Sequence, residues 1–318
     1  MKRRREGLPP FSFRSVFRCA AFVLLAASIA LAGSAWAGER LSIVTTTSDL
    51  RSLVEAVGGD RVAATSLVPP NLDPEEYQPK PQDVARLMQA RLVVRVGLDF
   101  DLWFDRLLAQ SGALGIRRGE PGYVDASFAI AALEVRGVTV GPGDGHAHGS
   151  GNPHYWLDPK NANIITGNIL EGLARIDPEN AGIYEANRMA FLARLDDKLQ
   201  EWEAKLAPFR DVPMVAYHNS WAYFARRFRL DFIGFIEQKP GVPPSPFHLA
   251  SLISAMRARN VPFIVRQPHD PEKNVAFAAQ KAGARVVVLA GSVGALPQAR
   301  DYVALFDSNV EALLRAKR

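Results

Sequence analysis

Cysteine is almost absent from the 318-residue sequence. The single cysteine, Cys19, lies in the N-terminal segment, and the residues before it do not resemble the small-residue motif that precedes a lipidated cysteine. If that segment is removed, the exported chain has no thiol, which excludes disulfides, thiolate metal sites and a cysteine nucleophile. Its fold must then be stabilised by the core alone.

The first 37 residues have the three parts of a secretory signal peptide. A basic start, MKRRR, precedes the apolar run CAAFVLLAASIALAG, and Ala35-Trp36-Ala37 matches a small-x-small cleavage site. We expect cleavage after Ala37 and export to the periplasm. An uncleaved membrane anchor is the less favoured alternative, because the run is short for a membrane span.

The excess of positive charge is confined to this segment. Residues 1–37 hold six of the 38 Lys and Arg and one of the 33 Asp and Glu, which leaves 32 of each in the remaining chain. The formal charge of that chain is therefore zero. The pI of about 9.4 for the full sequence is no evidence for a nucleic-acid partner, and we expect none.

Motifs of several common chemistries are also absent. The sequence has no GxGxxG or GxxxxGK[ST] phosphate loop, no GxSxG elbow and no HExxH zinc motif. Nucleotide binding and serine hydrolysis therefore have no signal here.

After residue 39, short β-branched runs alternate with helical patterns, which predicts parallel α/β layers. In the first half, Ser48 is expected to cap the first helix. In the second half, a C-terminal helix is expected to begin at Asp301. Strands are expected at 41–47, 62–68, 91–97, 212–217, 231–237, 262–267 and 284–290.

A long helical pattern lies between the two halves, interrupted near Asp177-Pro178. Pro178 suits a first helical position, and roughly thirty residues without an internal breaker would extend about 40 Å. We therefore expect an α/β fold of two lobes with parallel sheets, joined by a single long backbone helix. The expected divisions are a signal peptide at 1–37, an N-terminal lobe at 38–176, a connecting helix at 177–208 and a C-terminal lobe at 209–318.

Polar side chains follow the predicted strands, where ligands of parallel α/β lobes bind. Imidazoles and carboxylates drawn from both lobes would suit a divalent transition metal, and binding between lobes could couple to closure. These residues are Asp73, Glu75, Glu76, Tyr77, His154, His218, Glu237, His269 and Asp270.

Spacing alone leaves other interpretations open for these histidines. His154 and His218 lie beside aromatic residues, where a hydrogen-bonded structural histidine is a fair alternative. His248 and His269 are more typical of surface or helix-cap positions.

Four motifs, in this order after a signal peptide, resemble a known family. They are LDPEEYQPKPQD, NPHYWLDPKNA, VAYHNSWAYFARRF and RDYVALFDSNVEAL. Together they resemble the periplasmic zinc/manganese-binding proteins that feed metal ABC importers, and the resemblance covers the whole mature chain. It implies two α/β lobes joined by one long helix, with the metal held between them.

The resemblance also implies a ligand set. It places Glu75 where the family commonly has its first histidine ligand, and it places His154 and His218 at the second and third ligands. Gly291 stands about where an aspartate often supplies the fourth.

Glu237, in a loop at a strand end, is expected to help complete the site, and Asp270 or a water is expected to fill the remaining position. Two imidazoles with one or two carboxylates tolerate Mn(II) or Fe(II), but the Irving–Williams order ranks Zn(II) first. His146 and His148, in a glycine-rich segment, are either a weak capture site or part of a linker.

The sequence therefore predicts an exported solute-binding protein, monomeric and not an enzyme, that captures a divalent transition metal and delivers it to a membrane ABC permease. One alternative is a zinc-dependent hydrolase with Glu75 as general base. The other is a metal-free surface adhesin whose site has decayed, which Glu75 and Gly291 would suggest.

Overall fold

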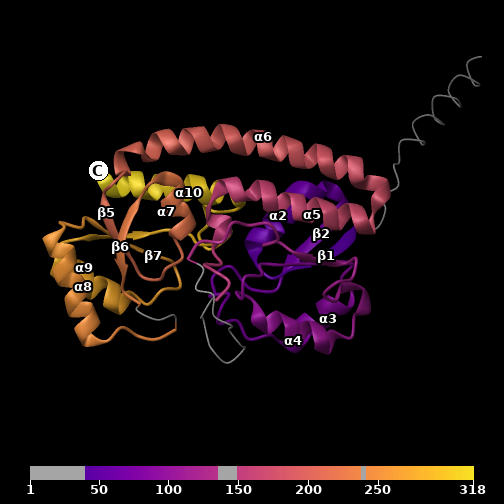
Figure 1. The fold of residues 1–318 in the computed structure, drawn as a ribbon, viewed down its shortest axis with the longest axis horizontal. Helices are drawn as coiled ribbons and strands as arrows, with labels where there is room; N and C mark the ends of the chain where they lie inside the picture. Colours follow the sequence, from indigo (N-terminus) through magenta and orange to yellow (C-terminus); the bar gives the residue numbers. More distant parts are fainter. Residues whose placement is uncertain (1–39, 135–148, 238–240) are drawn as a thin grey trace, which may run out of the picture. The chain divides into compact units, whose positions relative to one another are not determined.

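The computed structural model describes residues 40–134, 149–237 and 241–318 (Figure 1). Within these ranges the chain forms two four-stranded sheets, one in each lobe, and all strand pairs are parallel. No helix among the described residues is both long and apolar enough to cross a membrane. The predicted signal peptide with its cleavage after Ala37, and the histidines His146 and His148, lie outside these ranges.

The N-terminal sheet has the strand order β2-β1-β3-β4. Strand β1 is central, and its Ile43 pairs with Ala64 on one side and Leu92 on the other. Three of the strands lie where the sequence predicts them. The short β4 was not predicted, because three residues cannot display an alternating pattern. The bounds are β1 Leu41–Thr45, β2 Val62–Ser66, β3 Leu92–Arg95 and β4 Tyr123–Asp125.

The C-terminal sheet repeats this arrangement with the order β6-β5-β7-β8. Its first strand is again central, so β5 lies between β6 and β7. All four strands lie within predicted ranges. Their bounds are β5 Pro213–Ala216, β6 Asp231–Phe235, β7 Phe263–Arg266 and β8 Arg285–Val288.

Each lobe holds four of the described α-helices, and three of them connect its parallel strands. Those of the N-terminal lobe are α2 Ser48–Gly58, α3 Pro81–Met88, α4 Leu102–Ser111 and α5 Ala162–Ile176. Those of the C-terminal lobe are α7 Ala222–Phe228, α8 Pro246–Ala258, α9 Glu272–Ala282 and α10 Tyr302–Lys317.

The long helix α6 has 26 residues, Ala181–Leu206, which span about 39 Å. It runs beside both lobes in Figure 1 and contacts α2 and α5 of the N-terminal lobe and α10 of the C-terminal lobe. Helix α5 ends at Ile176, so the interruption expected near Asp177-Pro178 is present. The predicted fold of two parallel-sheet lobes with one long helix is thus confirmed, whereas the expected domain boundaries stay a prediction.

One buried side of α6 packs against both lobes. Tyr184 lies near its beginning and Trp202 near its end, and both are fully buried. The Trp202 ring lies 5.1 Å from the Phe306 ring of α10, and its indole donates to Asp307. The largest hydrophobic cluster of the described residues includes side chains of both sheets and of α6. A continuous core therefore joins the two lobes on this side.

Helix α2 begins at Ser48, one residue earlier than expected. Its N-cap is Thr47, whose hydroxyl accepts the Leu50 N–H at 3.4 Å, so the prediction of Ser48 as cap is wrong. Ser48 is instead the first helical residue, and its hydroxyl donates to the Val293 carbonyl of the other lobe at 2.7 Å. Either residue type can cap a helix, so only the tertiary contact separates them.

Two further hydrogen bonds join the lobes near Ser48. The Val293 N–H donates to the Asp49 carboxylate at 2.9 Å, and the Tyr302 N–H donates to the Ser52 hydroxyl at 3.0 Å. Asp49 is buried, and burial raises its pKa to about 7 even though the bond from Val293 lowers it. The first half of α2 is thus bonded both to the loop between β8 and α10 and to the first residue of α10.

We expect Gly172→Ala to lower the free energy of unfolding by about 1–3 kcal/mol through overpacking. An added Cβ would come within 2.3 Å of Val124 Cγ2 and 3.4 Å of Leu92. Gly167→Ala, in the same helix, is the control, because its Cβ would meet only the end of Arg188 at 3.6 Å. That change should be neutral or stabilising by up to about 1 kcal/mol. Urea unfolding of both variants checks the prediction, and equal stabilities would contradict it.

Candidate metal centre

Glu75 lies in the loop between β2 and α3. Its N–H donates to the Asp73 carboxylate at 2.9 Å, which tightens the turn, and the neighbouring Pro74 carbonyl accepts the Trp103 indole N–H at 3.1 Å. The Glu75 side chain is 5% exposed. A carboxylate held in such a turn is placed before any ligand arrives.

His154 precedes the short 3-10 turn Tyr155–Leu157 and is buried. Its N–H donates to the side-chain carbonyl of Asn152 at 3.1 Å, and its Nδ1 lies at the same distance from that oxygen. Asn152 uses its NH₂ group to donate to Glu134 and to the Asn219 carbonyl, which identifies the oxygen. An amide oxygen only accepts, so Nδ1 carries a proton. In the neutral ring this arrangement leaves the lone pair of Nε2 available to a metal.

His218 follows β5 and approaches from the other lobe. Its Nδ1 lies 2.5 Å from the Glu237 carboxylate. Glu237 follows β6, where its N–H donates to the Tyr217 carbonyl and its second carboxylate oxygen accepts the Gly241 N–H, both at 2.8 Å. His218 and Glu237 are thus both held at the ends of two adjacent strands, β5 and β6.

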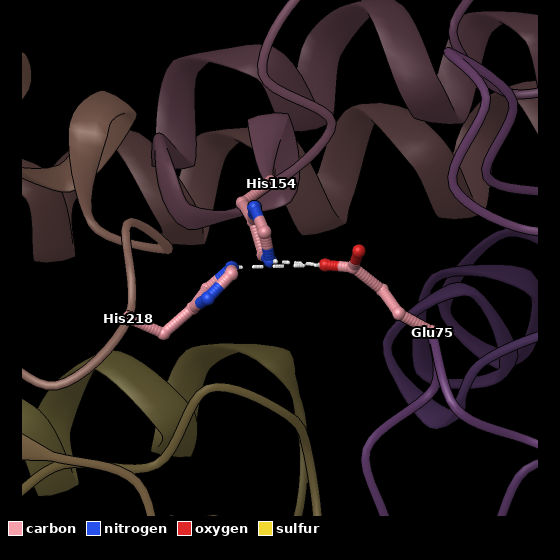
Figure 2. A group of neighbouring side chains, drawn as sticks. All are labelled: Glu75, His154 and His218. Atoms are coloured by element: carbon pink, nitrogen blue, oxygen red, sulfur yellow. Dashed lines mark ion pairs between the residues drawn. The ribbon is translucent and has the colours of Figure 1, made fainter. Parts of the chain in front are cut away.

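Three side chains converge from three separate segments, as Figure 2 shows. The Glu75 carboxylate oxygen lies 3.4 Å from His154 Nε2 and 3.8 Å from His218 Nε2. Each of the three residues offers one donor atom, and these three atoms all lie within 4.8 Å of one another. Two imidazole nitrogens and a carboxylate at this spacing form the kind of donor set that borderline divalent metals prefer.

Glu237 does not belong to this group of three. It contacts the Nδ1 of His218, whereas the Nε2 of His218 is directed to Glu75. The structure thus brings together three of the four predicted residues, and the fourth, Glu237, lines the same cavity beside His218.

The charges around His218 control its protonation in the metal-free protein. Burial lowers the pKa of His218, but the hydrogen bond that its Nδ1–H donates to Glu237 and the charges of Glu75, Glu237 and Asp73 outweigh that effect and raise the pKa to about 9. The metal-free imidazole is therefore protonated at neutral pH.

The three residues line a cavity of about 380 Å³. His269 and Asp270 also line it, with His269 Nε2 3.7 Å from the Asp270 carboxylate. Asp270 is committed to its own turn, because it accepts the Gln267 N–H at 2.6 Å, and burial raises its pKa. His248 lies elsewhere, in the first turn of α8, with its Nε2 2.9 Å from the Phe235 carbonyl, which agrees with the predicted position at a helix end.

Gln267 and Asn152 are site residues that the sequence reasoning missed. Gln267 directly follows β7 and lines the cavity beside Gly291. Its position after a strand was the available signal, since the same rule selected His218 and Glu237. Amides are weak metal donors, so Gln267 and Asn152 do not fit the pattern of imidazoles and carboxylates that predicts a metal site.

Similarity to known proteins extends over both lobes. A family model described as zinc-uptake complex component A, periplasmic, matches residues 43–316. The manganese ABC transporter substrate-binding lipoprotein PsaA of Streptococcus pneumoniae is 28% identical over 260 residues, which are 79% of each chain.

Solved structures give the same result. A crystal structure of ZnuA matches with a TM-score of 0.74 at 29% identity and covers 88% of this chain and 99% of that chain. The structure of the protein FpvC from Pseudomonas aeruginosa in complex with Mn²⁺ matches with a TM-score of 0.73 at 26% identity, over 87% and 98% of the two chains.

We expect the metal-free protein to lose stability as the pH rises from about 6.5 to 9. The folded pKa of His218, about 9, lies above its unfolded value of 6.5, so its stabilising effect is complete below 6.5 and disappears as the pH passes 9. The loss is up to about 3 kcal/mol. Urea unfolding across this range measures it. The His218→Gln variant removes the titration, so an equal loss in that variant would assign the effect to other groups.

Proposed function

The chain belongs to the family of periplasmic zinc-uptake complex component A proteins, and we propose that it captures a divalent transition metal ion between its two lobes and delivers it to an ABC importer. The metal ion is its cargo, and the partner is a membrane permease. We propose further that the protein acts in the periplasm as a monomer after cleavage of residues 1–37.

The observation that carries this proposal is the convergence of Glu75, His154 and His218 from both lobes. We propose that these three side chains are the metal ligands, through a Glu75 oxygen and the two Nε2 atoms. A binding protein must also release its cargo. A site divided between two lobes supports this, because separation of the lobes would divide the ligand set.

Zinc is the cargo that the donor set favours. Two imidazoles and one carboxylate match the tetrahedral nitrogen and oxygen sites of Zn(II), with one position left for water or another group. The Irving–Williams order also ranks Zn(II) above Mn(II) and Fe(II) at such a site. The family description and the manganese-binding relatives are consistent with a divalent metal in general.

Glu237 has a different role in this proposal from the one that its sequence position suggested. It accepts the hydrogen bond of His218 Nδ1, which fixes the tautomer and directs Nε2 toward the metal. We therefore propose that Glu237 orients a ligand, rather than binding the metal itself.

Alanine at His154 or at His218 should abolish submicromolar zinc binding, because each change removes one of three donors. The loss should exceed the roughly 10–100-fold that outer-sphere partners contribute. Titration of demetallated protein against a competing chelator measures it. His248→Ala is the matched control, because that histidine contacts the Phe235 carbonyl outside the site.

Unchanged affinity in both the His154 and the His218 variants would rule out the ligand assignment. The wild-type titration also separates the rival functions. Submicromolar binding without turnover of ester or peptide substrates is expected here, whereas a hydrolase would show turnover and a decayed site would show no binding.

Glu237→Gln should weaken zinc binding by about 10–100-fold, because the amide no longer fixes the protonated Nδ1 as a carboxylate does. Glu203→Gln, on the exposed side of α6, controls for the loss of one acid. X-ray absorption of the zinc-loaded proteins should show the same number of nitrogen and oxygen donors in the variant and the wild type. One oxygen donor fewer in the variant would make Glu237 a ligand.

A further inference from the structure

The cavity has a neutral wall formed by Gln267 and Gly291. Both residues line the same cavity as Glu75, His154 and His218. Gln267 directly follows β7, which pairs with β5, the strand that leads to His218. Gly291 follows β8, the other neighbour of β7. The wall thus lies at the strand ends where parallel sheets place their ligands.

Gln267 occupies the space that a side chain at position 291 would need. An ideal Cβ built on Gly291 would lie 1.7 Å from Gln267 Oε1 and 2.6 Å from its Cδ. Both distances are far below van der Waals contact. Gly291 therefore has no free space above its Cα, and a side chain there requires Gln267 to move.

Gln267 is held firmly in this position. Its side-chain NH₂ donates to the Ser220 hydroxyl at 2.9 Å, and its backbone N–H donates to Asp270 at 2.6 Å. Gln267 is 8% exposed and Ser220 is 1% exposed. A buried amide with these bonds does not leave its place without losing hydrogen bonds.

The same wall is bonded to the segments that carry the two histidines. Ser220 lies two residues after His218. The Gly291 carbonyl accepts the Trp156 indole N–H at 2.9 Å, and the Trp156 ring lies 5.3 Å from the His154 ring. Gln267 and Gly291 are therefore directly adjacent to both histidine segments.

We propose that Gln267 is a specificity-determining residue for the cargo metal. Its amide excludes a side chain from position 291, so this wall adds no carboxylate to the group of Glu75, His154 and His218. Other acids line the cavity outside this wall, namely Asp73, Glu76, Glu237 and Asp270. Mn(II) prefers carboxylate and water oxygens in six-coordinate sites, whereas Zn(II) accepts four donors rich in imidazole. The neutral wall therefore selects Zn(II) against Mn(II). This inference rests on the proposed function of the site.

Gln267→Glu is the most direct test, because it exchanges an amide for a carboxylate of equal size. Chelator competition on demetallated protein gives the Kd of Zn(II) and of Mn(II) for the wild type and the variant. We expect the ratio of Mn(II) to Zn(II) affinity to rise by about tenfold or more, because the added charge and hard oxygen help Mn(II) relatively more.

A second set of variants tests the same proposal at position 291. Gly291→Asp alone should lower the melting temperature, because its Cβ meets Gln267. Gln267→Ala with Gly291→Asp removes that clash and should shift the metal ratio toward Mn(II). Gln267→Ala with Gly291→Asn is the matched neutral control and should not shift it.

The proposal is overturned if either carboxylate variant binds zinc and keeps the wild-type metal ratio, or if the asparagine control shifts the ratio as much as the aspartate variant. Loss of zinc binding in both carboxylate variants also overturns it, since an added donor should not abolish a site. Failure of the proposed function gives a different result, in which the wild type binds no zinc or the His154 and His218 alanine variants bind it normally.

Discussion

The convergence of donors from two lobes depends on the core that the lobes share. Tyr184 and Trp202 bury the two ends of α6 against α2, α5 and α10, and one hydrophobic cluster includes both sheets. The bonds of Ser48 and Asp49 to Val293 add polar contacts between the same lobes. A loop of one lobe can therefore meet a loop of the other without a covalent link, and the Glu75 oxygen lies 3.8 Å from His218 Nε2.

Electrostatics within the site follows from this arrangement. His218 lies between two carboxylates, with Glu237 at Nδ1 and Glu75 near Nε2. Their charges outweigh the effect of burial and raise the pKa of His218 to about 9. His154 has a neutral partner instead, the Asn152 amide. The two imidazoles thus have different environments, although each keeps Nδ1 occupied and directs Nε2 to the same carboxylate.

Much of the fold could be predicted because its patterns are local. Buried parallel strands such as β3 and β7 begin with three consecutive apolar residues, and Pro178 marks the interruption before α6. Strand β4 could not be predicted, because it has three residues and depends on pairing with β3. The capping of α2 was assigned to Ser48 rather than Thr47 for a similar reason. Two adjacent capping residues look equivalent until a distant carbonyl, that of Val293, binds one of them.

The sequence by itself determined the two lobes and the long helix, and it indicated Glu75, His154 and His218 as candidate donors, since strand ends and motifs are properties of the chain order. Only the tertiary structure decided what each polar residue does there. Glu237 contacts His218 Nδ1 because β6 lies beside β5, and Gln267 covers Gly291 because β7 lies beside β8. The two pairs are 19 and 24 positions apart in the sequence. A local sequence pattern therefore does not show which side chains come into contact.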